Sequence, residues 1–92
     1  MKYDVSVLVP VYNVSKFIER CLHTLFGQTY DNIQYIFVND CTPDQSIEII
    51  QKVLNKYPQR KEHVKIINHD KNRGLAASRN TGIENAGGEY VL

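Results

Sequence analysis

The sequence has 92 residues, a length that corresponds to one small domain. Hydrophobic residues make up 42% of the chain and charged residues 23%, a composition typical of a soluble globular chain. The formal net charge is +1, from 11 basic and 10 acidic residues, which argues against a nucleic-acid or membrane-surface binder with a strong basic field.

Cysteine usage and hydropathy indicate a cytoplasmic protein. The two cysteines, Cys21 and Cys41, form no CxxC pair and the histidines are not clustered, so we expect a reducing compartment and no structural zinc site. No apolar run approaches the roughly 20 residues that span a bilayer, and the N-terminus lacks the hydrophobic region of a signal peptide. For the full-length protein, the inner face of the membrane is the alternative location.

The first third of the sequence predicts a strand followed by a helix. Residues 5–9 are a short apolar run, and Pro10, which has no N–H to donate to a ladder, would end this strand. A helix is expected from Ser15, as N-cap, to Phe26, because apolar residues recur here at helical period. Gly27 would stop this helix.

The middle of the sequence predicts a buried strand, a second helix and a third strand. Residues 33–38 are rich in β-branched and aromatic side chains and have apolar residues on both faces, as in a strand covered on both sides of a sheet. The second helix is expected over residues 43–57, with Thr42 as its N-cap and Pro58 ending it. Residues 64–68 form the third predicted strand.

The last part predicts a third helix and the start of a fourth strand. Residues 75–86 are rich in small side chains, so this helix can pack close to a sheet, and Gly87 and Gly88 would end it. Residues 89–92 open a fourth strand, which implies that more chain follows and that the sequence is a fragment, natural or engineered. The order β-α-β-α-β-α-β with short connections predicts a parallel sheet in a three-layer α/β/α domain.

Polar side chains gather in the loops that follow the first three strands. Asp40 comes directly after the buried strand, at the edge where open α/β sheets bind ligands; capping of the turn is an equally weighted role. The turn after the first strand contains no glycine, which counts against NAD binding and against a Walker-type ATP site. A receiver domain would need paired acids in the place of Pro10 and Val11.

Four motifs occur in an order and spacing that resemble one known family. They are SVLVPVYN at residues 6–13, QTY at 28–30, NDCTPD at 39–44, and NRGLAASRNTGI at 72–83 followed by GEY at 88–90. Together they resemble the nucleotide-binding half of the family 2 glycosyltransferases, which have the Rossmann-like GT-A fold. The resemblance covers essentially the whole chain and implies one domain over residues 1–92 that lacks its C-terminal part. It further implies an inverting enzyme that transfers a sugar from a nucleotide diphosphate donor to a glycan-type acceptor.

The resemblance also implies roles at the nucleotide base. Tyr12 would stack on the base, a contact worth about 1–3 kcal/mol, although packing at the mouth of the sheet is its alternative role. Asp40 would accept a hydrogen bond from the ring N–H of a uracil-like base, which points to a UDP-linked donor. Pro10, Val11 and Asn13 would shape the pocket mainly through backbone groups.

Further residues carry weaker implications. Arg73 and Arg79 are the candidate cations for the diphosphate, because guanidinium fits phosphate geometry. Their alternatives are a solvated loop residue for Arg73 and a structural salt bridge for Arg79. Asn39 stands where the family more often has a second aspartate, and Asp44 matches a later acid of the motif or caps the helix.

The resemblance places other parts of an active site outside this sequence. In the family, a divalent metal (Mn²⁺ or Mg²⁺) is bound by an Asp-x-Asp motif after the strand that opens at residue 89, and the catalytic base comes later still. We therefore assign no catalytic residue and expect the chain alone to be inactive. The three histidines share no spacing, and Cys41 has no paired base, so none is assigned a role.

The partners expected are a nucleotide-sugar donor and, for the full-length protein, a glycan or lipid-linked acceptor. An open strand edge and an uncovered sheet face favour a homodimer. The alternative function is a non-catalytic nucleotide-binding or scaffolding module with the same fold.

Overall fold

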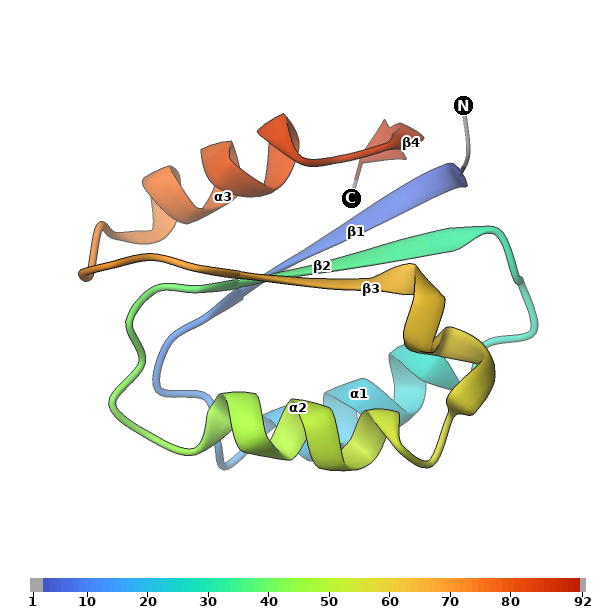
Figure 1. The fold of residues 1–92 in the computed structure, drawn as a ribbon, viewed down its shortest axis with the longest axis horizontal. Coiled ribbons are helices and arrows are strands. Elements are labelled where there is room, and N and C mark those ends of the chain that lie inside the picture. The colour runs from blue at the N-terminus through green and yellow to red at the C-terminus, as the bar shows by residue number, and fades with distance from the viewer. Residues whose placement is uncertain (1–2, 92) are drawn as a thin grey trace.

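The structure is a computed structural model that describes residues 3–91, with the side chains of residues 89–91 left out. Four parallel strands form one sheet in the order β3-β2-β1-β4, and helices connect them (Figure 1). The elements are β1 (Tyr3–Val11), α1 (Ile18–Phe26), β2 (Ile33–Asn39), α2 (Ser46–Leu54), the 3-10 helix η1 (Pro58–His63), β3 (Val64–Asn68), α3 (Leu75–Glu84) and β4 (Gly88–Val91).

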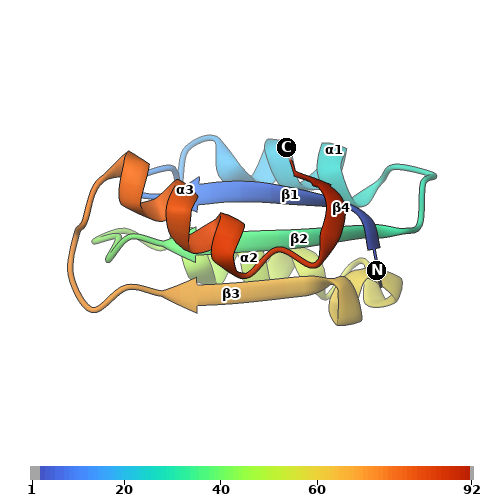
Figure 2. The ribbon, with the colours of Figure 1, turned by 90° about the horizontal axis from the view of Figure 1, so that it is seen from above.

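Helices cover both faces of the sheet, so the three-layer α/β/α prediction is confirmed. Helices α1 and α2 lie together on one face and α3 lies alone on the other (Figures 1 and 2). The register aligns Val11 with Asn39 and Asn39 with Asn68. The last residues of β1, β2 and β3 therefore form one row, and the loops that follow them leave the sheet at the same edge.

The larger core lies between the sheet and the α1–α2 layer. Ile18, Leu22 and Phe26 recur along α1 at the spacing of one helical face, and all three are buried. The Phe26 ring packs edge-on against Tyr35 of β2, with ring centroids 5.1 Å apart and planes at 90°. Each large apolar side chain buried in this way stabilises the fold by roughly 1.5–3 kcal/mol, so this core holds α1 in place.

On the other face, α3 lies close to β1, as its small residues predict. Ser78 and Gly82 are the buried residues of this helix. A Cβ at Gly82 would lie 3.1 Å from both methyl groups of Leu8, closer than ordinary van der Waals contact. The small-residue face of α3 therefore sets how near the helix comes to the sheet. The predicted end at residue 86 was placed two residues too late, since α3 ends at Glu84.

The strand β1 runs through Pro10 to Val11, so the prediction that Pro10 ends it was wrong. Pro10 is aligned with Val38 of β2. On its other side, β1 is aligned with β4 only from Tyr3 to Ser6. Within residues 3–91, the ladder on that side therefore requires no N–H from Pro10.

The predicted starts of the first two helices were also wrong, and one carboxylate explains why. Helix α1 begins at Ile18 rather than at Ser15, and α2 begins at Ser46 rather than after Thr42. Asp44 Oδ1 accepts hydrogen bonds from the Thr42 hydroxyl at 2.7 Å, the Ser46 hydroxyl at 2.6 Å and the Ser46 N–H at 3.1 Å. Its Oδ2 accepts the Ser15 N–H at 3.0 Å. These bonds fix Thr42 and Ser15 in loops, so neither residue caps a helix.

Helix α2 ends at Leu54, three residues earlier than predicted, and Pro58 begins the separate helix η1. This short helix carries Arg60, which is 1% exposed. Its guanidinium donates to four backbone carbonyls at the end of α1 and in the loop that follows, those of Phe26, Gln28, Tyr30 and Asp31. The guanidinium carbon also lies 5.7 Å from the centre of the Tyr35 ring. Arg60, from a distant segment of the chain, thus supplies hydrogen-bond donors to the backbone carbonyls at the end of α1.

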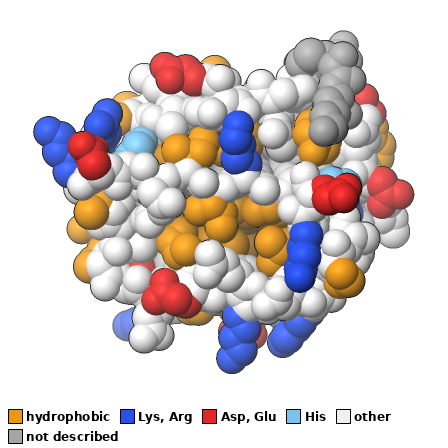
Figure 3. Space-filling view, viewed as in Figure 1, with side chains coloured by type: hydrophobic (Ala, Val, Ile, Leu, Met, Phe, Trp, Pro, Cys, Tyr) orange, Lys and Arg blue, Asp and Glu red, His pale blue; other side chains and the backbone are white. Residues whose placement is uncertain are grey.

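Figure 3 shows hydrophobic side chains gathered in a hollow on the side of the molecule where β3 is the outer strand. Partly buried residues of β3 and α2 that pack against the core are Val64, Ile66, Ile47, Ile49 and Leu54.

Among the described helices, none has the length and apolar character that crossing a membrane requires.

Candidate functional site

An open pocket lies at the edge of the sheet where β1 and β2 end and α3 begins. Its volume is about 310 Å³, which is in the range of a small-molecule site. The residues that line it are Pro10, Tyr12, Val14, Asp40, Asn72, Gly74, Leu75 and Ser78. The pocket therefore combines one carboxylate, one phenol ring and polar groups of the loop before α3.

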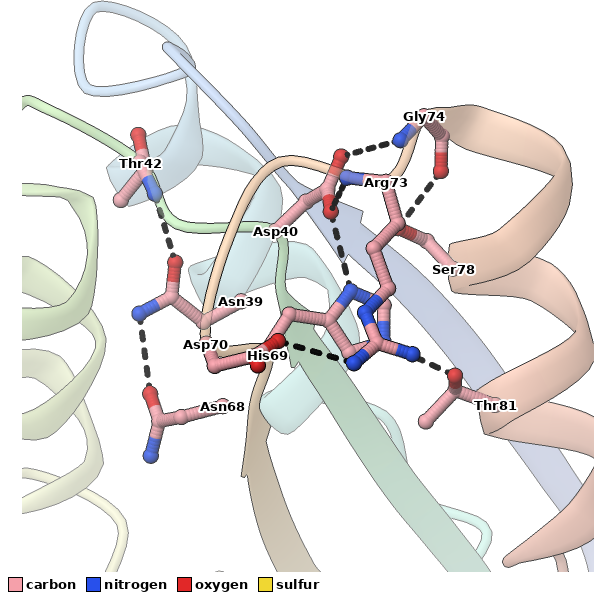
Figure 4. Close-up of polar contacts among 10 residues, drawn as sticks. All are labelled: Asn39, Asp40, Thr42, Asn68, His69, Asp70, Arg73, Gly74, Ser78 and Thr81. Atoms are coloured by element: carbon pink, nitrogen blue, oxygen red, sulfur yellow. Dashed lines mark hydrogen bonds and ion pairs between the residues drawn. The ribbon is translucent and has the colours of Figure 1, made fainter.

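Asp40 is the buried charge of this pocket, with 3% of its surface exposed. Its Oδ1 accepts the Arg73 N–H at 2.7 Å and a hydrogen bond from His69 Nδ1 at 2.9 Å, and its Oδ2 accepts the Gly74 N–H at 2.9 Å (Figure 4). Asp40 also donates its own N–H to the Val11 carbonyl at 3.0 Å. Asp40 thus joins the ends of β1 and β2 to the start of α3.

The hydrogen bonds decide the charge of Asp40. Burial raises the pKa of the Asp40 carboxyl, but the bonds from His69 and from the Arg73 and Gly74 amides outweigh burial and keep its pKa below the usual range. The group is therefore an ionised carboxylate at neutral pH and can only accept hydrogen bonds.

Gly74 has the backbone conformation that brings its N–H to Asp40. Its φ is +92° and its ψ is 170°, a region that is almost restricted to glycine. The same residue is the N-cap of α3, and its carbonyl accepts the Ser78 hydroxyl at 3.0 Å and the Ser78 N–H at 3.1 Å. One glycine therefore binds both Asp40 and the first turn of the helix.

His69, to which sequence reasoning assigned no role, is a neighbour of Asp40. Its side chain is 7% exposed, and its Nε2 lies 2.8 Å from the Thr81 hydroxyl on α3. A signal for this contact exists in the register: Asp40 and His69 each follow directly after the aligned pair Asn39 and Asn68. Residues at equivalent positions after neighbouring parallel strands lie side by side.

Asn39 forms a separate set of hydrogen bonds at the ends of β2 and β3. Its Nδ2 donates to Asn68 Oδ1 at 2.9 Å, and its Oδ1 accepts the Thr42 N–H at 2.9 Å (Figure 4). Asn39 does not line the pocket. Its amide therefore contacts protein groups that an aspartate at this position could satisfy only in part, because a carboxylate has no N–H to donate.

Of the residues after β1, Tyr12 and Pro10 line the pocket, and the Tyr12 side chain is open to a ligand at 46% exposure. Val11 has its side chain buried in the core on the α1 face and contributes its carbonyl to Asp40. Asn13 has a positive φ of 59° and donates its N–H to the Thr42 hydroxyl at 2.8 Å. Val11 and Asn13 therefore act through backbone groups in this structure.

The two arginines expected at the diphosphate lie outside the lining of the pocket. The Arg73 guanidinium pairs with Asp70 at 2.8 Å on the surface, where the two side chains are 48% and 74% exposed. Arg79 is exposed on α3 and forms no ion pair with another residue of the described part of the chain. A ligand could reach both side chains, since neither is held by a buried partner.

Within residues 3–91, no group of three or more His, Cys, Asp or Glu side chains is arranged to hold a metal ion. The described residues thus do not fit the divalent metal that the family resemblance implies.

Comparison with known proteins shows the family to which the chain belongs. The family model described as "Glycosyl transferase family 2" matches residues 6–92. The chain belongs to glycosyl transferase family 2. Among curated members, the "Uncharacterized glycosyltransferase EpsJ" of Bacillus subtilis is 46% identical over 87 residues, which cover 95% of this chain and 24% of that protein.

Solved glycosyltransferase structures share the fold. S. aureus TarS 1-349 in complex with UDP-GlcNAc has a TM-score of 0.84 at 33% identity, covering 97% of this chain and 25% of TarS 1-349. The mannosyltransferase PcManGT from Pyrobaculum calidifontis, in complex with GDP-Man and Mn²⁺, has a TM-score of 0.87 at 26% identity, covering 99% of this chain and 26% of its own. The chain therefore spans about a quarter of the length of these relatives.

Proposed function

We propose that this chain forms the donor-nucleotide site of an inverting glycosyltransferase and that the nucleotide is UDP. The observation that carries the proposal is the pocket in which the ionised Asp40 and the exposed Tyr12 ring meet at the carboxyl edge of the sheet. Family membership supports transfer of a sugar, and the complex of TarS with UDP-GlcNAc supports a uracil nucleotide.

Counting acceptor positions supports a base contact at Asp40. A carboxylate has about four lone-pair positions, and protein donors occupy three of them in Asp40. The residue lines the pocket, so the remaining position is available to a ligand N–H. Uracil has such a ring N–H at N3, whereas cytosine has a lone pair there, which a carboxylate would repel.

Tyr12 supplies the apolar surface for the base. Its ring lies at the pocket with about half of its surface exposed, and no partner in the described residues binds its hydroxyl. Stacking of a base on such a ring contributes about 1–3 kcal/mol and does not discriminate strongly between bases. In this proposal Tyr12 supplies affinity and Asp40 supplies the choice of base.

Calorimetric titration of UDP against the chain and three variants tests the proposal. We expect Asp40→Ala and Tyr12→Ala to weaken UDP binding by about tenfold or more each, while Asp31→Ala, which removes an exposed acid elsewhere, leaves it unchanged. Binding should persist in EDTA, because no described cluster holds a metal. Equal affinity of the unmodified chain and both pocket variants would refute the assignment.

The remaining functional expectations form part of the same proposal. The acceptor is a glycan, and the chain by itself neither transfers sugar nor hydrolyses a nucleotide sugar; turnover in the presence of Mn²⁺ would contradict this. A homodimer also stays a prediction, and light scattering across a dilution series tests it. The alternative, a non-catalytic nucleotide-binding module, predicts the same UDP titration but no transfer by the full-length protein.

A further inference from the structure

We propose that His69 is a positioning residue, clamped by Thr81, which fixes the Asp40 carboxylate in the orientation that discriminates between nucleotide bases. This inference rests on the proposed function, since it concerns how the same pocket chooses its ligand. It assigns a role to two residues, one in the loop after β3 and one on α3, that do not line the pocket.

The imidazole of His69 is held at both ring nitrogens. Nδ1 lies 2.9 Å from Asp40 Oδ1, and Nε2 lies 2.8 Å from Thr81 Oγ1 (Figure 4). The backbone of the same residue is fixed as well, because the His69 N–H donates to the Asn39 carbonyl at 2.8 Å. With the side chains of His69 and Asp40 only 7% and 5% exposed, water competes little for these bonds.

The chemistry of the array determines which nitrogen carries the hydrogen. Asp40 is ionised and accepts only, so the hydrogen between the two side chains must be on His69 Nδ1. In the neutral ring, Nε2 then has a lone pair and accepts the Thr81 O–H. The Asp40 carboxylate therefore sets the tautomer, and the Thr81 hydroxyl donates to the lone pair that this tautomer leaves on Nε2.

This bond restricts the carboxylate more than the two backbone amides could alone. All three donors lie in the loop between β3 and α3, and His69 is in addition anchored to Thr81 on α3 and to the Asn39 carbonyl at the end of β2. Oδ1 accepts from both the anchored imidazole and the Arg73 amide, so the carboxylate cannot turn to offer a different lone pair to a ligand. A fixed acceptor favours uracil N3–H and disfavours cytosine N3, whereas a mobile carboxylate could turn away from the cytosine lone pair.

The test compares the affinities of the chain and its variants for UDP and for CDP. His69→Leu removes both ring contacts, and we expect the ratio of UDP to CDP affinity to fall about tenfold. In His69→Asn, the side-chain NH₂ can replace Nδ1–H, so the ratio should stay within about threefold of the original. Thr81→Val keeps the imidazole but removes the hydroxyl that holds its Nε2, and it should give an intermediate ratio. His23→Leu, which removes an imidazole bonded to Tyr57 on the distant α1–α2 layer, is the matched control and should leave the ratio unchanged.

Nitrogen NMR of the histidine side chains provides a readout that needs no ligand. We expect the neutral form of His69 to carry its hydrogen on Nδ1, the nitrogen that faces the Asp40 carboxylate. A hydrogen on Nε2 instead would overturn the inference, because a lone pair would then face the carboxylate.

The results separate this inference from the proposed function. If the unmodified chain binds UDP no better than CDP, the proposed function fails and the inference fails with it. If it prefers UDP but His69→Leu retains the full preference, only the inference is overturned. A reduced preference in His69→Leu with rescue in His69→Asn supports both.

Discussion

The Gly74 N–H donates to Asp40 Oδ2 at 2.9 Å and so joins the end of β2 to the start of α3 across 34 positions of sequence. The donor has a backbone conformation that is nearly exclusive to glycine, and the acceptor is a carboxylate of the pocket. The shape of the site therefore depends on a backbone angle as well as on side chains.

Gly74→Ala should destabilise the fold although the added methyl group has room. No atom lies within 4 Å of a Cβ built at Gly74, so the cost comes from its φ of +92° and is about 1–3 kcal/mol of unfolding free energy. Gly87→Ala is the matched control, because its Cβ would meet its nearest atoms at 3.5 and 3.9 Å without a positive φ. Denaturant unfolding of both variants measures the difference. Equal stability of Gly74→Ala and Gly87→Ala would show that a side chain at position 74 is compatible with its positive φ.

Arg60→Met should lower the free energy of unfolding by about 2–4 kcal/mol. The substitution keeps an apolar stem but leaves the carbonyls of Phe26, Gln28 and Tyr30 without their buried donor. Arg20→Met, on the exposed surface of α1, is the control and should change stability by less than about 0.5 kcal/mol. If thermal or urea denaturation finds the two variants alike, the carbonyls are satisfied by water and Arg60 does not hold α1.

Asp44 should make stability fall in acid. Burial raises the pKa of its carboxyl, but hydrogen bonds from Ser46, Thr42 and the Ser15 and Ser46 amides outweigh burial and hold its pKa well below the usual value. The ionised form is thus preferred in the folded chain, so this stabilisation is present above about pH 4 and is lost as pH falls below it.

Urea unfolding between pH 7 and pH 2 checks this prediction with Asp44→Asn. The variant should be less stable at pH 7 by about 1–3 kcal/mol and should lose less stability on acidification than the unmodified chain. Parallel pH curves for the two proteins would rule out the role given to Asp44. Asp31→Asn, an exposed acid at the other end of the sheet, serves as the control.

Tyr12→Phe should retain UDP affinity, whereas Tyr12→Ala should lose about 1–3 kcal/mol of binding free energy, because the face of the ring rather than its hydroxyl provides the contact. Phe17 is 70% exposed and does not line the pocket, so Phe17→Ala removes an aromatic ring without affecting binding. Titration calorimetry distinguishes these cases. Unchanged binding by Tyr12→Ala would mean that the base lies elsewhere.

The layered fold follows from local patterns, which is why it could be predicted. Residues 64–68 were predicted as a strand from their apolar run, and β3 has these bounds. The buried stripe of α1 and the small-residue face of α3 likewise depend on the 3.6-residue helical repeat. Such patterns arise within one helix or strand, so they can be recognised without knowing which element it packs against.

Several features that the sequence did not predict depend on hydrogen bonds between distant residues. Ser15 fits an N-cap by its type, but Asp44, which is 29 positions away, accepts its N–H and keeps it in a loop. The role of Arg60 at α1 has no local signal, since its acceptors lie about 30 residues earlier. His69 could have been found only from strand register, which the sequence alone does not specify.

The most direct measurement for the central claim compares UDP with N3-methyl-UDP on the unmodified chain. No variant is needed, so no loss of folding can obscure the result. If Asp40 accepts the hydrogen bond of the base, the methyl group removes that donor and meets the buried carboxylate, and affinity should fall about tenfold or more. Equal affinity for the two nucleotides would contradict the claim that Asp40 binds the base.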